Sequence, residues 1–274
     1  MFTIPANELQ WEINPPQVMG ILNMTPDSFY EASRFSTIES ALAQTEDFIS
    51  KGASIIDIGA QSTRPLAQLH GPEIEIERLL PVVKAIHEKY PNQLVSVDTF
   101  YADVAEATLE AGAHIINDIS CASFDEKILA VVKKYNAGYI GMHLTGTVHA
   151  IHHVEERDNL MNSLLDYFES KKKLLLSYGI KEWVVDPGFG FGKTVEENFT
   201  LIKKLSALKV LELPILLGVS RKSSLYKTLG ITSNEALNAT TIAHTVALLN
   251  GANILRVHDV KEASEIIQLL PYLQ

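Results

Sequence analysis

The stretch WVVDPGFGFGKTVEENFTLIKKLSAL, from Trp183 to Leu208, decides the fold. It begins with a short apolar run at 183–185, continues through a glycine-rich loop and ends in a segment of helical period at 195–208. A strand, a polar loop and a helix form the repeating unit of α/β proteins with a parallel sheet. Recurrence of this unit along the chain would predict a parallel sheet covered by helices.

The unit recurs eight times. Strand-like runs lie at Val18–Leu22, Ser54–Ile58, Leu94–Val97, Ile115–Asn117, Tyr139–Met142, Trp183–Val185, Ile215–Gly218 and Ile254–Val257, and helical segments follow at 37–51, 73–90, 101–111, 125–136, 156–178, 195–208, 234–250 and 260–270. Eight units favour a closed (β/α)8 TIM barrel over an open sheet, and such a barrel takes about 250 residues. We therefore expect an α/β TIM barrel that forms a single domain over residues 1–274. Residues 1–14 would be a short N-terminal extension, a small hairpin that closes the bottom of the barrel.

Composition excludes several classes of protein. The net charge of −10, from 23 basic and 33 acidic residues, argues against nucleic acid as a partner, because phosphate backbones select basic surfaces. No apolar run approaches the roughly 20 residues of a membrane span, and the first eight residues do not resemble a signal peptide. The single cysteine, Cys121, excludes an intramolecular disulfide. These features predict a cytoplasmic protein without a membrane partner.

Polar side chains mark the end of every predicted strand. In a β/α barrel the carboxyl ends of the strands carry the active site. A single aspartate after a strand is as often a helix cap as a functional group, but eight polar ends in register are not explained by capping. The side chains in question are Asn23, Asp57, Asp98, Asn117, His143, Asp186, Lys222 and His258.

These strand ends and their loops contain two charge classes. The cationic set, Arg64, Arg221, Lys222, Arg256 and His258, suits an anion such as phosphate or pyrophosphate. The acidic and amide set, Asn23, Asp57, Asp98, Asn117 and Asp186, suits a neutral heterocycle, because a carboxylate can accept two parallel N–H bonds from a 2-amino-4-oxo ring. A pterin and a guanine both present such an edge.

Two apparent motifs are rejected. The run from Gly188 to Thr194 is not a Walker A phosphate loop, because Pro187 occupies the position where that loop requires glycine. The histidines 143, 149, 152 and 153 match no metal-binding spacing, and we expect them in a solvated loop rather than around a metal ion.

The strand ends together resemble the motifs of the dihydropteroate synthases, in the order of that family and from about residue 17 to the C-terminus. The matching segments are 23–29 (NMTPDSF), 62–65 (STRP), 96–99 (SVDT), 116–118 (IND), 186–193 (DPGFGFGK), 220–223 (SRKS) and 256–259 (RVHD). The resemblance implies a transferase of folate biosynthesis. Such an enzyme condenses 6-hydroxymethyl-7,8-dihydropterin pyrophosphate with 4-aminobenzoate through an SN1-like pterin cation, and releases 7,8-dihydropteroate and pyrophosphate.

The resemblance also implies roles for individual residues. Asp98, Lys222, Arg256 and Asp186 would be catalytic, and the pterin would contact Asp98, Asn117, Met142, Asp186, Gly218, Lys222 and Arg256. Pyrophosphate would bind Asn23, Arg64, Arg256 and His258, with Mg²⁺ on Asn23. The aminobenzoate pocket, which sulfonamide inhibitors would share, would comprise Phe29, Thr63, Arg64, Pro65, Phe191 and Ser223. The loops at 23–36 and 60–71 would close over the substrates. A homodimer through the later helices would use Val246, Leu248 and Leu249.

The chain departs from the family pattern in these loops. Tyr30-Glu31-Ala32-Ser33 replaces the common Ser-Asp-Gly-Gly, Ala60-Gln61 replaces Gly-Glu, and residues 142–149 lack the usual Gln and Pro. The missing glycines predict a stiffer first loop. Two alternatives share the barrel: a methyltetrahydrofolate-dependent methyltransferase, which has no need for the anion set, and a non-catalytic pterin-binding barrel.

Overall fold

The computed structural model describes residues 2–24, 34–61, 69–147, 153–154 and 157–273. Eight parallel strands lie in the order β8-β7-β6-β5-β4-β3-β10-β9, and a bridge between Val185 and Ile215 joins the two outer strands. The strands are β3 (Gln17–Asn23), β4 (Ile55–Gly59), β5 (Leu94–Asp98), β6 (Ile115–Asp118), β7 (Gly138–Met142), β8 (Val184–Asp186), β9 (Leu216–Leu217) and β10 (Ile254–Val257). The sheet thus closes, and the predicted α/β TIM barrel is confirmed.

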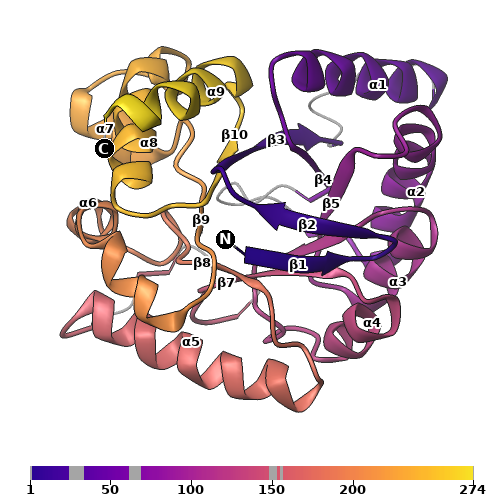
Figure 1. The fold of residues 1–274 in the computed structure, drawn as a ribbon, viewed down its shortest axis with the longest axis horizontal. Helices are drawn as coiled ribbons and strands as arrows, with labels where there is room; N and C mark the ends of the chain where they lie inside the picture. The colour runs from indigo at the N-terminus through magenta and orange to yellow at the C-terminus, as the bar shows by residue number, and fades with distance from the viewer. Residues whose placement is uncertain (1, 25–33, 62–68, 148–152, 155–156, 274) are drawn as a thin grey trace.

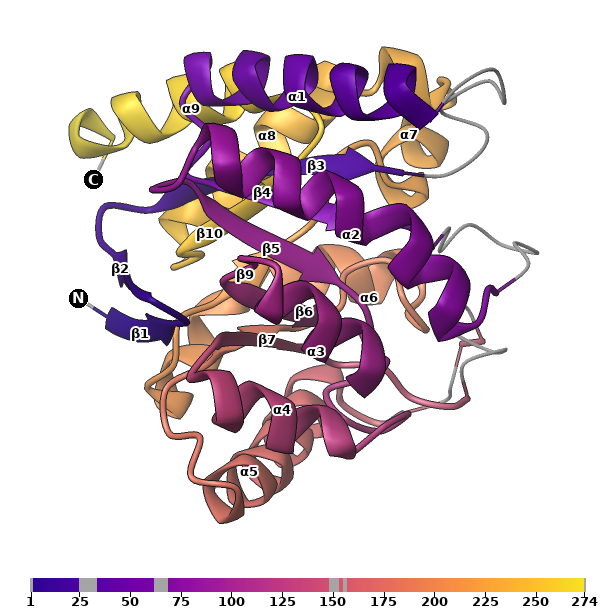
Figure 2. The same cartoon turned by 90° about the vertical axis from the view of Figure 1, so that its right-hand side faces the viewer.

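Helices surround this sheet and follow one another around its outer side (Figures 1 and 2). Those at the predicted positions are α1 (Arg34–Ser50), α2 (Pro72–Lys89), α3 (Ala102–Glu110), α4 (Lys127–Tyr135), α5 (Leu160–Ser177), α6 (Val195–Lys203), α8 (Leu237–Leu249) and α9 (Val260–Leu269). The predicted helix at 195–208 is shorter: α6 starts at a capping box of Thr194 and Glu197, ends at Lys203 and gives way to the 3₁₀ helix η2 (Leu205–Leu211). The structure adds the short helix α7 (Ser223–Leu229), and the 3₁₀ turns η3 (Ser233–Glu235) and η4 (Leu270–Tyr272).

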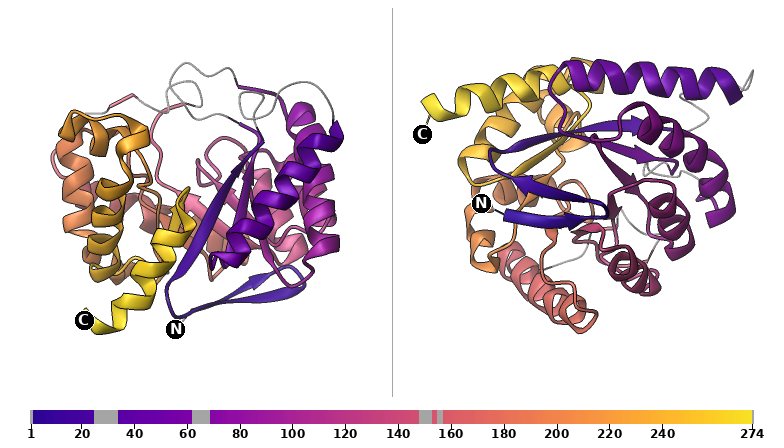
Figure 3. Two further views of the ribbon diagram at one scale, coloured as in Figure 1. Left: turned by 90° about the horizontal axis from the view of Figure 1, so that it is seen from above. Right: turned by 45° about the vertical axis from the view of Figure 1, so that its right-hand side comes forward.

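The N-terminal extension is a hairpin of β1 (Phe2–Ala6) and β2 (Leu9–Ile13), which pair in antiparallel fashion. It crosses the end of the barrel at which the strands begin (Figures 1 and 3). Ile4, Trp11 and Ile13 are buried there against the first inward-facing side chains of the barrel strands, such as Met19 and Ile55. Apolar burial of this kind stabilises the fold and seals the bottom of the barrel.

Strand β4 shows how the sequence directs polar groups into the barrel. Successive side chains of a strand point to opposite faces. Ile55 lies in the cluster at the barrel bottom, whereas Ile56 and Ile58 lie in the larger core beneath the helices. Asp57 therefore projects into the barrel one layer above Ile55.

No helix in the described parts of the chain is long and apolar enough to cross a bilayer.

Candidate active site

The floor of the site is the Asp57 carboxylate, which is fully buried and accepts three hydrogen bonds. Its Oδ1 accepts from Ser96 Oγ at 2.6 Å, and its Oδ2 accepts from Asn117 Nδ2 at 3.2 Å and from Arg256 Nε at 2.6 Å. These partners come from β5, β6 and β10. Asp57 was identified in the sequence only as one of the polar strand residues; its signal was a lone acid inside the apolar run Ile55-Ile56-Asp57-Ile58.

Arg256 connects this floor to Asp98. Its second contact is Nη2 to Asp98 Oδ2, at 2.7 Å, and about a fifth of each side chain remains exposed. Burial alone would lower the pKa of Arg256, but Asp57 and Asp98 outweigh it and raise the pKa. Burial raises the pKa of Asp98 to about 7, although Arg256 opposes that shift. A planar cation is thus held between two carboxylates at the carboxyl end of the barrel.

Asp186 and Met142 form the adjoining wall, where the strands β8 and β7 pair. The Asp186 carboxylate is nearly buried, and its Oδ1 accepts from the Gly188 N–H at 2.8 Å. Burial raises the pKa of Asp186, opposed first by the charge of Lys222. Met142 is buried in a small apolar cluster against which Phe191 packs. An apolar surface therefore borders the carboxylates.

Lys222 crosses the loop that joins β8 to α6. Its Nζ donates to the Phe189 carbonyl and lies 4.4 Å from the centre of the Phe191 ring. Gly190 lets the two segments approach, because a Cβ there would lie 2.9 Å from Lys222 Cδ. Burial lowers the pKa of Lys222 to about 8, with Asp186 acting in the opposite direction. Gly218 is buried beside the Arg256 side chain, as the position of β9 next to β10 requires.

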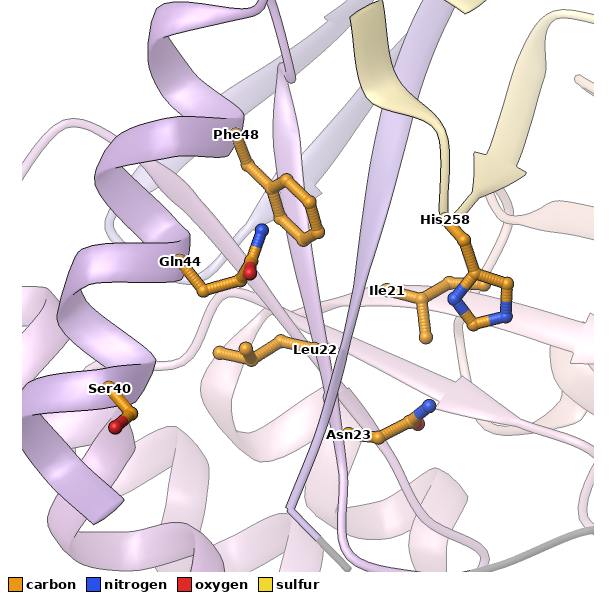
Figure 4. Close-up of a pocket in the computed structure, with 7 residues that line it drawn as sticks. All are labelled: Ile21, Leu22, Asn23, Ser40, Gln44, Phe48 and His258. Atoms are coloured by element: carbon orange, nitrogen blue, oxygen red, sulfur yellow. The ribbon is translucent and has the colours of Figure 1, made fainter. Parts of the chain in front are cut away.

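The predicted pyrophosphate residues Asn23 and His258 lie together. Both side chains are exposed, and both line a pocket of about 370 Å³ that is also bordered by Ser40, Gln44 and Phe48 of α1 (Figure 4). The loop containing Ser220 is tied to this region, because Ser220 Oγ accepts from the His258 N–H at 3.2 Å. Ile21 and Leu22 of β3 complete the lining, so the pocket has both polar and apolar walls, and His258 follows Arg256 by two residues.

Arg221, a member of the predicted cationic set, is engaged elsewhere. Its guanidinium donates to both oxygens of Asp259, at 2.9 and 2.8 Å, and to the carbonyls of Ser233 and Asn234. It fastens the loop before α7 to the start of α9. Its neighbour Ser223 is exposed at the first position of α7.

The prediction that four histidines lie in a solvated loop was wrong for His143; His153 is exposed, and His149 and His152 lie outside the described residues. His143 is buried at the end of β7, and its ring lies 4.7 Å from that of Tyr167. Its Nδ1 contacts Lys193 Nζ at 3.2 Å, a pairing that sequence analysis missed. Within the described residues, no group of three or more acidic, histidine or cysteine side chains could hold a metal ion.

Several predicted residues lie outside the described part of the chain. Phe29 falls in 25–33, and Thr63, Arg64 and Pro65 fall in 62–68. Of the predicted aminobenzoate pocket, the structure thus places Phe191 and Ser223. Gln61, which differs from the glutamate common in the family, lies within the described residues. Its amide donates to the Glu75 carboxylate and to the His70 carbonyl, both at 2.7 Å.

A closed barrel whose strand ends gather carboxylates, an amide and cations at one end defines an enzyme that binds a heterocycle next to an anion. The family model described as pterin binding enzyme matches residues 19–258. The dihydropteroate synthase of Synechocystis sp. is 38% identical over 255 residues, which are 92% of this chain and 88% of that protein. The chain belongs to the pterin-binding enzymes and, within them, to the dihydropteroate synthase family, as its motifs predicted.

Solved structures agree. A Yersinia pestis dihydropteroate synthase in complex with a sulfonamide drug matches with a TM-score of 0.91 and 35% identity, covering 99% of each chain. A Xanthomonas albilineans dihydropteroate synthase with 4-aminobenzoic acid matches with a TM-score of 0.91 and 30% identity, covering 100% of this chain and 99% of that one.

Proposed function

We propose that the chain condenses 6-hydroxymethyl-7,8-dihydropterin pyrophosphate with 4-aminobenzoate in folate biosynthesis. The observation that carries this proposal is the convergence of Asp98, Asn117 and Asp186 with Arg256 and Lys222 at one end of the barrel. The methylene carbon–oxygen bond breaks and its electron pair leaves with pyrophosphate. The amine nitrogen then bonds to that carbon and gives up one proton to water.

The pterin would lie against the carboxylate wall. Asp186 and Asn117 accept and donate hydrogen bonds at the pyrimidine edge, while Met142 supports one face of the ring. Lys222 donates to ring acceptors, a role that suits an ammonium beside Asp186 and the Phe191 ring. Asp98, when ionised, stabilises the cation that forms as the bond breaks, because opposite charges interact strongly in a partly buried site.

The leaving group would bind at the Asn23 and His258 pocket. Arg256 binds both carboxylates and lies two residues before His258, so its charge can stabilise pyrophosphate without being removed from Asp57. Arg64 completes this set in the proposal. Fixed cations around a developing phosphate charge lower the barrier, because they need little reorganisation during the reaction.

Magnesium fits this pocket as an ion with few protein ligands. The exposed Asn23 amide offers one oxygen, and the pyrophosphate and water would supply the others, in keeping with the preference of Mg²⁺ for phosphate oxygens and water. When bound, the ion would supply charge neutralisation of the leaving group.

The amine would be held by Phe191 and Ser223, with Phe29, Thr63, Arg64 and Pro65. The structures of the relatives from Xanthomonas albilineans, with 4-aminobenzoic acid, and from Yersinia pestis, with a sulfonamide drug, support an aryl amine site that sulfonamides share. Closure of the loops at 23–36 and 60–71 over the substrates remains part of this proposal.

A homodimer through α8 is also proposed. Val246 and Leu249 are 38% and 44% exposed and Ile242 is 57% exposed, whereas the predicted contact Leu248 is buried in the core. Apolar side chains at positions 242, 246 and 249 lie on one side of the helix, and burial of such a face in a partner would be favourable.

The direct test mixes the purified protein with the pterin pyrophosphate, 4-aminobenzoate and Mg²⁺. We expect equimolar pyrophosphate and dihydropteroate. Methyl transfer from methyltetrahydrofolate without any condensation would favour the methyltransferase, and pterin binding without either product would favour a non-catalytic barrel.

A further inference from the structure

The side chain of Lys193 is buried beneath the loop that joins β8 to α6, and only 6% of the residue is exposed. Its Nζ lies 2.8 Å from the Gly188 carbonyl oxygen, 3.0 Å from the Phe191 carbonyl oxygen and 3.2 Å from His143 Nδ1. An ammonium group has three N–H donors, so three acceptors satisfy it. With its donors used in this way, Lys193 is a structural cation rather than a substrate ligand.

The Lys193 ammonium has no carboxylate among these acceptors. Burial, together with the charge of Arg157, lowers the pKa of Lys193 to about 7, and Asp186 opposes the shift. Burial also lowers the pKa of His143, to about 2, so the ring is neutral and its Nδ1 can accept when Nε2 carries the proton. If Lys193 loses a proton, its amine keeps two N–H donors for the carbonyls and can accept from the other tautomer of His143. The three contacts thus survive titration.

The loop held by Lys193 has little stiffness of its own. Gly188, Gly190 and Gly192 all adopt positive φ, a region that glycine enters at low cost. The β8–α6 loop nevertheless presents three groups to the site in sequence: the Gly188 N–H, bound by Asp186; the Phe189 carbonyl, bound by Lys222; and the Phe191 ring, beneath the Lys222 ammonium. One internal bond, from the Phe191 N–H to the Gly188 carbonyl at 3.1 Å, closes the turn, and side-chain contacts such as those of Lys193 and Asn198 add to it.

His143 connects Lys193 to the barrel wall. The backbone N–H of His143 donates to the backbone carbonyl of Asp186 at 2.8 Å, and the His143 ring packs edge-on against Tyr167. Lys193 thus joins both ends of a four-residue turn, Gly188 and Phe191, to a rigid strand end. Since the ring and the carbonyl that face Lys222 lie within this turn, its geometry sets their positions.

We propose that Lys193 is a positioning residue for the proposed condensation, in which the Gly188–Lys193–Phe191 and Lys193–His143 contacts hold the Phe191 ring in place for the aryl amine. This proposal rests on the proposed function. The pterin wall itself comes from the strand ends at Asp98, Asn117 and Asp186, whereas the Lys193 contacts go to Gly188, Phe191 and His143. Loss of the Lys193 contacts should therefore affect the amine more than the pterin.

The test uses Lys193→Met, which keeps the length of the side chain but removes its donors, together with His143→Leu and the matched control His143→Asn. The Asn amide oxygen can take the place of Nδ1 as an acceptor. In Lys193→Met and His143→Leu we expect the KM for 4-aminobenzoate to rise about tenfold or more, as the loss of a charged hydrogen bond would produce. The Kd for the pterin pyrophosphate should change by less than about threefold, and His143→Asn should resemble wild type.

Two further readouts separate this inference from a general loss of stability and from a failure of the proposed function. The double variant Lys193→Met/His143→Leu should be little worse than Lys193→Met alone, because that substitution already removes the Lys193–His143 contact. Amide hydrogen exchange at residues 188–191 should be faster in both single variants, whether or not the protein turns over substrate. Wild type without turnover would refute the proposed function alone.

An unchanged KM for the amine in a folded Lys193→Met variant would overturn the positioning role. So would equal losses of pterin and amine binding, or additive effects in the double variant. If Lys193→Met does not fold, the comparison of His143→Leu with His143→Asn decides: equal kinetics in these two would also overturn the proposal.

Discussion

Replacement of Arg256 by methionine tests the charged floor of the site. The variant leaves the Asp57 carboxylate fully buried with hydrogen bonds from Ser96 and Asn117 but without its cation. Removal of one partner of a buried ion pair costs about 3–5 kcal/mol. The side chains of Arg256 and Asp98 are 22% and 20% exposed, so water can replace the lost hydrogen bond to Asp98. We therefore expect a loss at the lower end of that range, about 3 kcal/mol.

A loss of about 3 kcal/mol corresponds to a fall of roughly 6–12 °C in Tm for a domain of this size. Urea unfolding followed by circular dichroism would measure the free energy, with the slope m checked for change. The matched control is Asp57→Asn/Arg256→Met. Asparagine is uncharged and can still accept from Ser96, so the double variant should be more stable than Arg256→Met alone.

Two results would refute this reasoning. The first is an Arg256→Met variant whose free energy of unfolding lies within about 1 kcal/mol of the wild-type value, which would mean that water replaces the cation at Asp57. The second is a double variant less stable than the single one, which would mean that Asp57 stabilises the barrel through its other contacts.

Three other predictions follow from single contacts. Asp186→Asn should weaken pterin binding about 100-fold in calorimetry, because an amide cannot accept two parallel N–H bonds; affinity close to wild type would remove Asp186 from the pterin wall. Gly188→Ala should lower the free energy of unfolding by about 2 kcal/mol or more, because φ is +69° and the new Cβ would lie 2.3 Å from the His143 carbonyl oxygen; wild-type stability in urea would contradict that geometry. Burial raises the pKa of Glu75 from 4.5 to about 7, so the folded state binds its proton more tightly than the unfolded chain. The contribution of Glu75 is then fully present below about pH 4.5 and is lost as the pH rises to about 7; the stability of Glu75→Gln relative to wild type should increase by up to about 3 kcal/mol from pH 4 to pH 8, and a constant difference would contradict the shift.

The barrel could be predicted from the sequence because each strand is a short apolar run and each helix repeats its apolar residues at three- and four-residue steps. It also predicted which polar residues end the strands, since those follow directly from the strand positions. The polarity of Asp57 is visible in the sequence, but its three partners depend on the register of β4 with β5 and on the pairing of β3 with both β4 and β10.

Contacts between loops could not be predicted in the same way. Arg221 and Lys222 are adjacent cations, yet Arg221 turns to Asp259 while Lys222 turns into the site. Arg221 also adopts a positive φ, a backbone conformation that no periodicity reveals. The burial of His143 and Lys193 likewise depends on two loops that meet only in the folded barrel.

A crystal structure with the dihydropterin pyrophosphate bound tests the central claim most directly. We expect the pyrimidine edge of the pterin within hydrogen-bonding distance, about 3 Å, of Asp186 and Asn117, with the pyrophosphate between Arg256 and the pocket of Asn23 and His258. A pterin bound away from Asp186, or a pyrophosphate without contact to Arg256, would contradict it.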